Sequence, residues 1–260
     1  MLWEEYVKEK QTYDSLAKKR KVSKRTIQRR LDKINVNKKK QSPAATVVIM
    51  DTTYFGRKFG VMVFRDHYKK KNIYWKFIKH ENIKEYVIGI HYISENGWKI
   101  VGIVCDGKRG VFNAFGQIPV QMCQYHQIAI VTRYITKKPR LQAGVELREL
   151  ILLLTKTDKE SFTGGLNEWH KRWKIFLKEK TINPDTDKWH YTHRRLKSAY
   201  RSLNTNLPYL FTWYDYPELN MPNTTNSLEG TFSNLKTKLR VHSGLKEHRK
   251  QKVIDEILNQ

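Results

Sequence analysis

"TVVIMDTTYFGRKFGVMVFRDHYKKKNIYWKFI", residues 46–78, contains three short segments rich in β-branched and aromatic residues. The segments are TVVIMD, KFGVMVFRD and NIYWKFI, and the polar stretch RDHYKKKN supplies the turn between the second and the third. Three successive strands joined by short connections favour an antiparallel meander. We therefore expect a sheet that begins with three strands from this stretch.

The segments that follow add helices and further strands. ENIKEYVIGIHYISENG, residues 81–97, places apolar residues at helical spacing. WKIVGIVCD (98–106) has the pattern of a fourth strand, KRGVFNAF (108–115) that of a short helix, and IPVQMC (118–123) that of a fifth strand. This order predicts an α/β fold, with a mixed five-stranded sheet and helices on its faces.

Asp51 and Asp106 each end one of these apolar strands. A carboxylate at the end of a buried strand costs desolvation energy unless something pairs with it, and neighbouring strands would bring the two close together. Two carboxylates at short range repel each other, so a shared divalent cation such as Mg²⁺ would keep both ionised. The alternative is that each Asp merely starts a turn, a frequent role of Asp before Thr or Gly.

The charge of the chain limits its partners. Its 50 Lys and Arg residues exceed its 25 Asp and Glu residues, which gives a formal net charge of +25. Such an excess suits a polyanion and favours nucleic acid as the partner. Ribosome association, a membrane surface or a well-solvated basic surface are the alternatives. With 39% hydrophobic residues, the 260-residue chain can bury a sizeable core.

Targeting signals and cysteine usage both favour a cytoplasmic protein. No apolar run reaches the roughly 18 residues that span a bilayer, and the first 30 residues are too charged for a signal peptide. The two cysteines, Cys105 and Cys123, cannot form a disulfide framework and fit a reducing compartment. We expect no membrane partner.

Residues 1–36 have the pattern of two short helices joined by a tight turn, with Thr12 and Ser23 as N-caps. This pattern predicts a helix-turn-helix DNA-binding domain, followed by a linker at residues 37–45. An amphipathic helical hairpin without any role in DNA binding is the alternative. The outer face of the second helix, which we expect to lie in a DNA major groove, carries Lys24, Arg25, Gln28 and Arg29.

A lone carboxylate, Glu229, stands in NTTNSLEGTFSNLKTKLR, residues 223–240, ahead of a row of cations. Together with VVIMDTTYFGR, IVCDGKRG and CQYH, this stretch resembles the Mutator-type DDE transposases of bacterial insertion sequences. The resemblance covers nearly the whole chain, and its most specific parts are CQYH and the segment around Glu229. It implies a ribonuclease H-like catalytic domain over residues 46–260.

The resemblance also implies a function and a site. Asp51, Asp106 and Glu229 would be the catalytic residues and would hold two Mg²⁺ or Mn²⁺ ions. The protein would bind the double-stranded DNA of an element's ends as a homodimer or higher oligomer in the bacterial nucleoid. It would free a 3′-OH by hydrolysis and direct that hydroxyl at target DNA. The residues expected to hold DNA phosphates are Lys108, Arg109, Lys236, Lys238 and Arg240.

Two rival functions stay open from the sequence. One is a DNA-binding regulator or domesticated transposase without activity, and the other is a ribonuclease H-like nuclease that cleaves without strand transfer. The intact set of three acids argues against the first, and nothing in the sequence excludes the second. Members of the group often carry a Cys-rich zinc-binding segment ahead of the helix-turn-helix. This sequence has none, so it is either a shorter variant or lacks an upstream part.

The long spacing between Asp106 and Glu229 predicts a helical insertion at about residues 127–215, which are helical in pattern and rich in aromatic residues. By the resemblance, Cys123 and His126 shape the site or contact DNA; the alternative is a buried Cys beside an ordinary His. We do not expect a structural zinc ion, because a four-ligand site would need a second pair of ligands, for which His190 and His193 are the nearest candidates.

Three further expectations concern single residues. Trp169 and Trp173 lie four apart on one helical face and are expected in the core. Trp189 and Trp213 lie in turn-like surroundings and are candidates for stacking on an unpaired base. Asp66 opens a basic turn and is expected to tolerate replacement by Ala with activity nearly intact.

Overall fold

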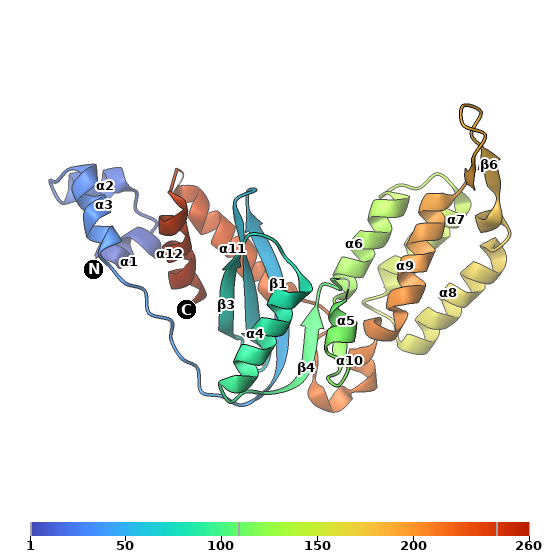
Figure 1. The fold of residues 1–260 in the computed structure, drawn as a ribbon, viewed down its shortest axis with the longest axis horizontal. Coiled ribbons are helices and arrows are strands. Elements are labelled where there is room, and N and C mark those ends of the chain that lie inside the picture. The colour runs from blue at the N-terminus through green and yellow to red at the C-terminus, as the bar shows by residue number, and fades with distance from the viewer. Residues whose placement is uncertain (1, 109, 243, 260) are drawn as a thin grey trace.

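The fold is built around one mixed sheet of five strands (Figure 1). The computed structural model describes residues 2–108, 110–242 and 244–259. The strand order is β3-β2-β1-β4-β5; β2 is antiparallel to its neighbours β1 and β3, and β4 and β5 run parallel to β1. The predicted α/β fold with an antiparallel meander is confirmed at this level. The strands are β1 (Ala45–Phe55), β2 (Phe59–Asp66), β3 (Lys71–Ile78), β4 (Lys99–Cys105) and β5 (Val120–Met122).

Helices cover both faces of the sheet. The helix α4 (Ile83–Glu95) and the short α5 (Val111–Ala114) pack on one face, whereas α11 (Asn226–Val241) and α12 (Glu247–Leu258) pack on the other. Across the described residues, no helix combines the length and the apolarity needed to cross a bilayer.

The central strand β1 shows why both faces are covered. Val47 and Ile49 point into the cluster shared with α11 and α12, whereas Val48 and Met50 point into the cluster shared with α4. All four are buried, since successive side chains of a strand face opposite sides of the sheet. This near-continuous apolar run is therefore the sequence signature of a strand buried on both faces.

The close approach of α4 to the sheet depends on Gly89. A Cβ at this position would lie 2.2 Å from Cζ of Phe64, a fully buried ring on β2. Because real Cβ atoms do not approach so closely, a glycine lets α4 lie flat on the aromatic side chain. This contact holds α4 against the face of the sheet that includes β1 and β2.

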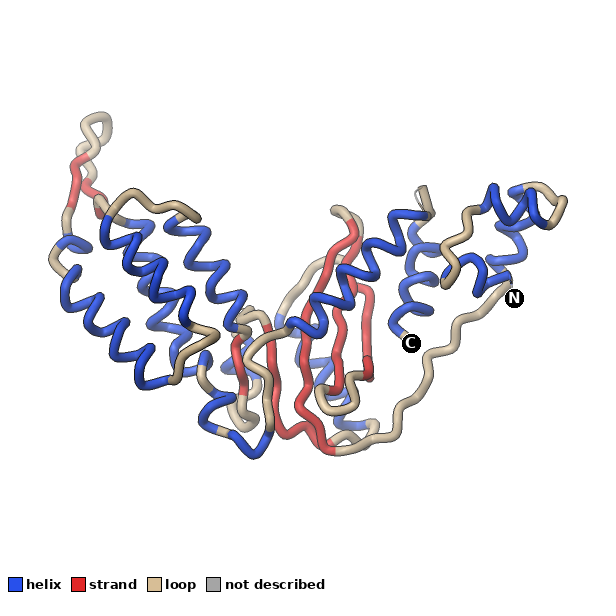
Figure 2. The backbone as a smooth tube through the Cα atoms, turned by 180° about the vertical axis from the view of Figure 1, so that it is seen from behind, coloured by secondary structure: helices blue, strands red, loops and turns tan. Residues whose placement is uncertain are grey.

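Between β5 and α11 the chain forms a helical lobe with its own apolar core (Figures 1 and 2). Trp169 is buried in this core, as predicted, and its indole N–H donates to the Ala143 carbonyl at 2.9 Å. Trp173 packs on the same core half-buried. A two-stranded hairpin, β6 (Lys180–Ile182) with β7 (Trp189–Tyr191), extends from the lobe. The helices are α6 (Gln124–Ile135), α7 (Gln142–Leu153), α8 (Lys159–Trp173), α9 (Arg194–Leu210) and α10 (Thr212–Asp215), with 3₁₀ turns η1 (Phe176–Lys178) and η2 (Pro217–Leu219).

The N-terminal residues form three helices, α1 (Leu2–Val7), α2 (Tyr13–Lys19) and α3 (Lys24–Asp32). Both predicted N-caps are confirmed: Thr12 Oγ1 accepts from the Ser15 N–H, and Ser23 Oγ accepts from the Thr26 N–H. These helices share one apolar cluster with α11 and α12, to which all three contribute buried residues. An ion pair at 2.6 Å between Asp32 of α3 and Arg249 of α12 adds to this contact.

The segment that connects α3 to β1 is extended, and other parts of the chain hold it. The Lys38 ammonium donates to the Trp75 carbonyl at 3.0 Å. Asn259 holds the segment twice, by accepting from the Lys39 N–H at 2.7 Å and by donating to the Asn37 carbonyl at 2.6 Å. The predicted linker between the N-terminal helices and the sheet is therefore bound to β3 and to the residue that follows α12.

Asp66 corrects one expectation. Its side chain is buried at the end of β2 and accepts from the Thr46 hydroxyl at 2.6 Å and from the Tyr68 N–H at 2.9 Å. Replacement by Ala would remove the acceptor of the Tyr68 N–H and one of the two acceptors near the buried Thr46 hydroxyl, which also lies 3.1 Å from the Val47 carbonyl. Asp66 is a structural residue, so Asp66→Ala is not the neutral control that the sequence suggested.

Candidate functional site

Three neighbouring parallel strands form the base of the candidate site at the level where β4 and β5 end, whereas β1 continues beyond this level to Phe55. β1 and β4 pair with Ile49 opposite Val104, and Asp51 and Asp106 each lie two residues beyond that pair. β4 and β5 pair with Cys105 opposite Met122, so that Cys123 follows next to Asp106. The structure thus places Asp51, Asp106 and Cys123 side by side along one edge of the sheet.

Asp51 is buried in an unfavourable environment for a charge. Burial raises the pKa of its carboxyl to about 7; the negative charges of Asp106 and Glu229 add to this rise, whereas the Thr52 N–H, which donates at 2.7 Å, and His126 oppose it. Asp106 is half-buried and accepts from the Lys108 N–H at 3.0 Å. The charges of Asp106 and Glu229 therefore both act on the buried carboxyl of Asp51.

The N-terminal ends of α6 and α11 lie next to the strand residues of the site. The Gln124 N–H of α6 donates to the Asn223 carbonyl at 3.0 Å, and the Asn223 amide donates back to the Gln124 side chain at 3.0 Å. The N–H and the hydroxyl of Thr225, the residue before α11, both donate to the Cys123 sulfur at 3.4 Å. These bonds fix the start of α11 against the end of β5, and with it Glu229.

Cys123, His126 and Glu229 form the tightest group of potential ligand atoms in the described part of the chain. One ligand atom from each lies within 4.8 Å of the other two, and His126 Nδ1 lies 4.0 Å from Glu229 Oε1. His126 Nδ1 is buried and has no well-aligned hydrogen bond to any described residue. Sulfur, nitrogen and oxygen donors together suit a transition metal such as Zn²⁺ better than Mg²⁺.

Charge coupling within this group is strong. Interaction with the Cys123 sulfur raises the pKa of His126 to about 9, with Asp51 and Asp106 contributing, although burial opposes the rise. Burial would raise the pKa of the Cys123 thiol, but contacts with His126 and Thr225 outweigh it and lower the pKa. The Cys123 sulfur and the nearby acids therefore favour the protonated form of His126, whereas binding of a metal ion would require its neutral form.

The partner of the Cys-His pair differs from the one considered from sequence. His193 lies at the start of α9, where its Nε2 is 2.8 Å from the Glu179 carboxylate and its ring stacks on Phe176. His190 is exposed on β7. The residue that joins Cys123 and His126 is Glu229, which follows His126 by 103 positions, and no local signal in the sequence links them.

The basic residues predicted to contact DNA lie in three places. On α3, Arg25 and Arg29 are exposed, Gln28 is half-buried, and Lys24 pairs with Asp14 at 2.6 Å. Near the carboxylates, the Lys108 ammonium lies 3.8 Å from the Glu81 carboxylate, whereas Arg109 lies outside the described residues. On α11 are Lys236, Lys238 and Arg240.

The two tryptophans proposed for base stacking differ in exposure. Trp189 is 55% exposed on the β6–β7 hairpin, with the Lys180 ammonium 3.9 Å from the centre of its ring. Trp213 is half-buried on α10, and its indole N–H is buried without a hydrogen-bond partner among the described residues. Only Trp189 offers a broad open face.

No protein family and no curated protein matches this chain. A solved structure to which it is similar is a chain of the cryo-EM structure of the simian T-cell lymphotropic virus intasome in complex with PP2A regulatory subunit B56 gamma. The identity is 13%, the alignment covers 66% of this chain and 52% of that chain, and the TM-score is 0.25. The similarity therefore spans about half of that chain and carries no argument about fold or function.

Proposed function

We propose that the chain is a metal-dependent DNA transposase of the Mutator type, with a ribonuclease H-like catalytic domain. The observation that carries the proposal is the approach of Asp51, Asp106 and Glu229 from β1, the end of β4 and α11, close enough for the charges of Asp106 and Glu229 to raise the pKa of Asp51. The order of the five strands, a meander followed by two parallel strands, also fits a ribonuclease H-like arrangement.

The proposal assigns a divalent cation to the three carboxylates, of which Glu229 also belongs to the group of ligand atoms formed with Cys123 and His126. Asp51 is buried, and the only hydrogen bond its side chain accepts within the described residues comes from the Thr52 N–H. A carboxylate that is buried, repelled by two others and poorly bonded is stabilised by a bound cation, and oxygen ligands suit Mg²⁺ or Mn²⁺. Asp51, Asp106 and Glu229 would hold the two ions expected from the resemblance. Bound there, the ions supply stabilisation of the attacking and leaving oxygens of a phosphodiester.

The chain's own residues bind and orient the DNA in this proposal. The His126 cation lies beside the carboxylates, at the first turn of α6, and is placed to attract a phosphate. Lys108 and, on the face of α11 that carries Glu229, Lys236 and Arg240 hold the backbone of the strand to be cut. The exposed Arg25 and Arg29 of α3 contact the element's ends, and the protein acts as a dimer or higher oligomer on DNA.

The test is a paired assay of cleavage and strand transfer. Purified protein is given a target plasmid and a duplex that carries the element's end with flanking DNA and is labelled at the 5′ end of the strand to be transferred, with Mg²⁺ or Mn²⁺. We expect release of a 3′-OH end and its joining to the plasmid, and loss of both in Asp106→Asn. Glu168→Gln, which removes an exposed carboxylate from α8, is the matched control and should behave as the wild type.

The assay also separates the two rival functions. Cleavage without joining would identify a nuclease that lacks strand transfer. Binding of the duplex with neither step under any divalent cation would identify a DNA-binding regulator. Either result would overturn the transposase proposal.

A further inference from the structure

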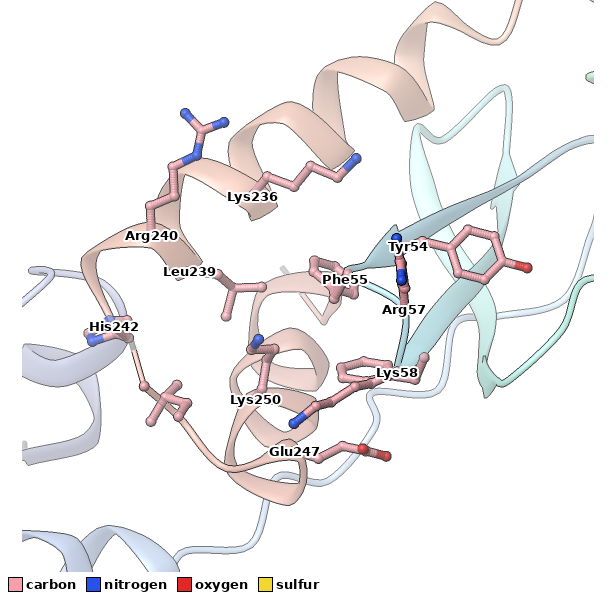
Figure 3. A pocket seen from close by; sticks show the side chains of 14 residues that line it. Tyr54, Phe55, Arg57, Lys58, Lys236, Leu239, Arg240, His242, Glu247 and Lys250 are labelled. Carbon is pink, nitrogen blue, oxygen red and sulfur yellow. The ribbon is translucent and has the colours of Figure 1, made fainter.

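A pocket of about 470 Å³ lies at the far end of α11 from Glu229 (Figure 3). Its walls come from the turn between β1 and β2, the C-terminal half of α11 and the start of α12. A pocket of this size accepts a ligand comparable to one or a few nucleotides and is too small for a duplex. We call it the α11 pocket.

Cations dominate the α11 pocket. Figure 3 shows basic side chains from all three walls: Arg57 and Lys58, Lys236 and Arg240, and Lys250. Within the described residues, none of the five has a carboxylate within ion-pair distance. Glu247 is the acid among the lining residues, and its carboxylate accepts from the Gln251 side chain. Uncompensated charge of one sign in a recess attracts an anion.

Apolar side chains lie among these cations. Phe55 is half-buried at the end of β1, its ring tilted by 34° against that of Phe59 with ring centres 5.4 Å apart, and Leu239 of α11 adds to the apolar part. A simple inorganic anion would gain nothing from contact with these apolar side chains. A nucleotide does, because its phosphate needs cations while its base gains by stacking on an aromatic ring.

The α11 pocket is linked to the carboxylates by the geometry of one helix. Lys236 and Arg240 follow Glu229 by 7 and 11 residues, so that at 100° per residue both lie within about 20° of its face, roughly 10 and 16 Å along the axis. Lys238, nine residues on, lies on the opposite face by the same rule. Along β1, Phe55 lies about 13 Å beyond Asp51.

We propose that the α11 pocket binds single-stranded DNA adjoining the phosphodiester that is cut, with phosphates on its cations and an unpaired base on Phe55. The proposal rests on the proposed function for the position of that phosphodiester. With about 3.4 Å between stacked nucleotides of one strand, 10–16 Å corresponds to roughly three to five nucleotides. The pocket thus holds the strand locally unpaired while the carboxylates act on it.

The test measures binding without cleavage. The affinity for fluorescein-labelled (dT)₁₂ is followed by anisotropy at several salt concentrations, with EDTA present so that no cutting occurs. Lys236→Gln combined with Arg240→Gln should reduce the slope of log K against log salt by about 1.4, because each neutralised phosphate of a single strand contributes about 0.7. The control is Lys171→Gln combined with Lys174→Gln, which removes two exposed cations from α8 and its C-cap and should change the slope far less.

A second experiment tests the contact between Phe55 and a base. Phe55→Leu keeps an apolar side chain but removes the stacking surface, and should weaken (dT)₁₂ binding about tenfold with an unchanged salt slope. Its affinity for a blunt duplex should stay as in the wild type, and its thermal unfolding should confirm that it folds. The proposal is overturned if Phe55→Leu binds (dT)₁₂ as well as the wild type, or if the α11 double variant matches the α8 control. Because EDTA removes catalysis, a wild type that binds in this way but never cleaves DNA would overturn the transposase proposal and leave the pocket intact.

Discussion

The two ends of α11 carry opposite charges in opposite surroundings. At its N-terminal end, Glu229 lies with Cys123 and His126 and influences the buried Asp51. At its C-terminal end, Lys236 and Arg240 line the α11 pocket and have no ion-pair partner among the described residues. An acid in the first turn and cations in the last also suit the helix dipole, so the charge pattern alone would indicate only a stable helix.

The side chains around each end of α11 indicate which ligand that end suits, which the charges of the helix alone do not. Carboxylates gathered at the ends of buried strands need a cation, whereas unpaired cations around an aromatic ring need a polyanion with a stacking face. One helix therefore joins a place suited to chemistry on a phosphodiester with a place suited to holding the strand. Changes at the first end should affect the reaction, and changes at the second should affect binding.

The largest effect is expected at the acid end. Asp51→Asn and Glu229→Gln should each lower the single-turnover rate of DNA cleavage by about 10³-fold or more, because ligands of a shared cation act as one unit. The double variant should be no worse than the worse of the two single variants. A double variant whose loss equals the product of the two single losses would contradict a shared role, as measured by release of a labelled 3′ end.

A smaller effect concerns the bonds that hold α11 at the site. Cys123→Ala leaves the buried N–H of Thr225 without its acceptor, and the Thr225 hydroxyl with only the Glu229 carboxylate at 3.5 Å, which should lower the free energy of unfolding by about 1–3 kcal/mol. Cys123→Ser keeps an acceptor and should recover part of that loss. Urea unfolding followed by circular dichroism measures both, and an unchanged midpoint for Cys123→Ala would show that these bonds do not anchor the helix.

At the basic end the effect should appear in substrate binding. Lys236→Gln combined with Arg240→Gln should raise the DNA concentration needed for half-maximal cleavage on the order of tenfold and leave the maximal rate unchanged, since uniform binding is what it removes. The α8 double variant at Lys171 and Lys174 serves again as the control. A fall in the maximal rate at saturating DNA would mean that these cations act in the reaction itself.

The smallest effect is a pH dependence of the free energy of unfolding, caused by a residue at the C-terminal end of α11. His242 caps the helix in a buried position against the Tyr6 ring, and burial lowers its pKa. The unfolded chain binds a proton on this side chain at a higher pH than the folded protein does, so the stability it contributes is present above about pH 6.5 and falls as the pH drops below it. His242→Gln should reduce the difference in unfolding free energy between pH 7.5 and pH 5.5, and an unchanged difference would assign the effect to other groups.

The sheet could be predicted because each strand is marked by the pattern of its own consecutive residues. Runs of β-branched residues mark the strands, and Asp106 directly follows β4 as expected, but Asp51 does not end its strand because β1 continues four residues further, to Phe55. Parallel pairing of β1 with β4 brings the two acids to one level of the sheet. The helical spacing before β4 predicts α4 in the same way. These features need no information from distant parts of the chain.

The rest depends on contacts between distant segments. The approach of Glu229 to Cys123 and His126 is set by the packing of residues 223–225 on the head of α6, which no local pattern encodes. The α11 pocket likewise forms only when the turn after β1 meets the end of α11. Asp66 was misjudged for the same reason, because its partner Thr46 lies twenty residues earlier on a neighbouring strand.

The most direct test of the central claim uses one preparation and two readouts. The wild type and Glu229→Gln are mixed with the same 5′-labelled end duplex in Mg²⁺, and bound DNA and released 3′ ends are measured from each sample. The two proteins should bind the duplex equally, or the variant more tightly because it has lost a negative charge beside the phosphate, while only the wild type releases 3′ ends. Release by Glu229→Gln at the wild-type rate would contradict the assignment of this carboxylate to the reaction.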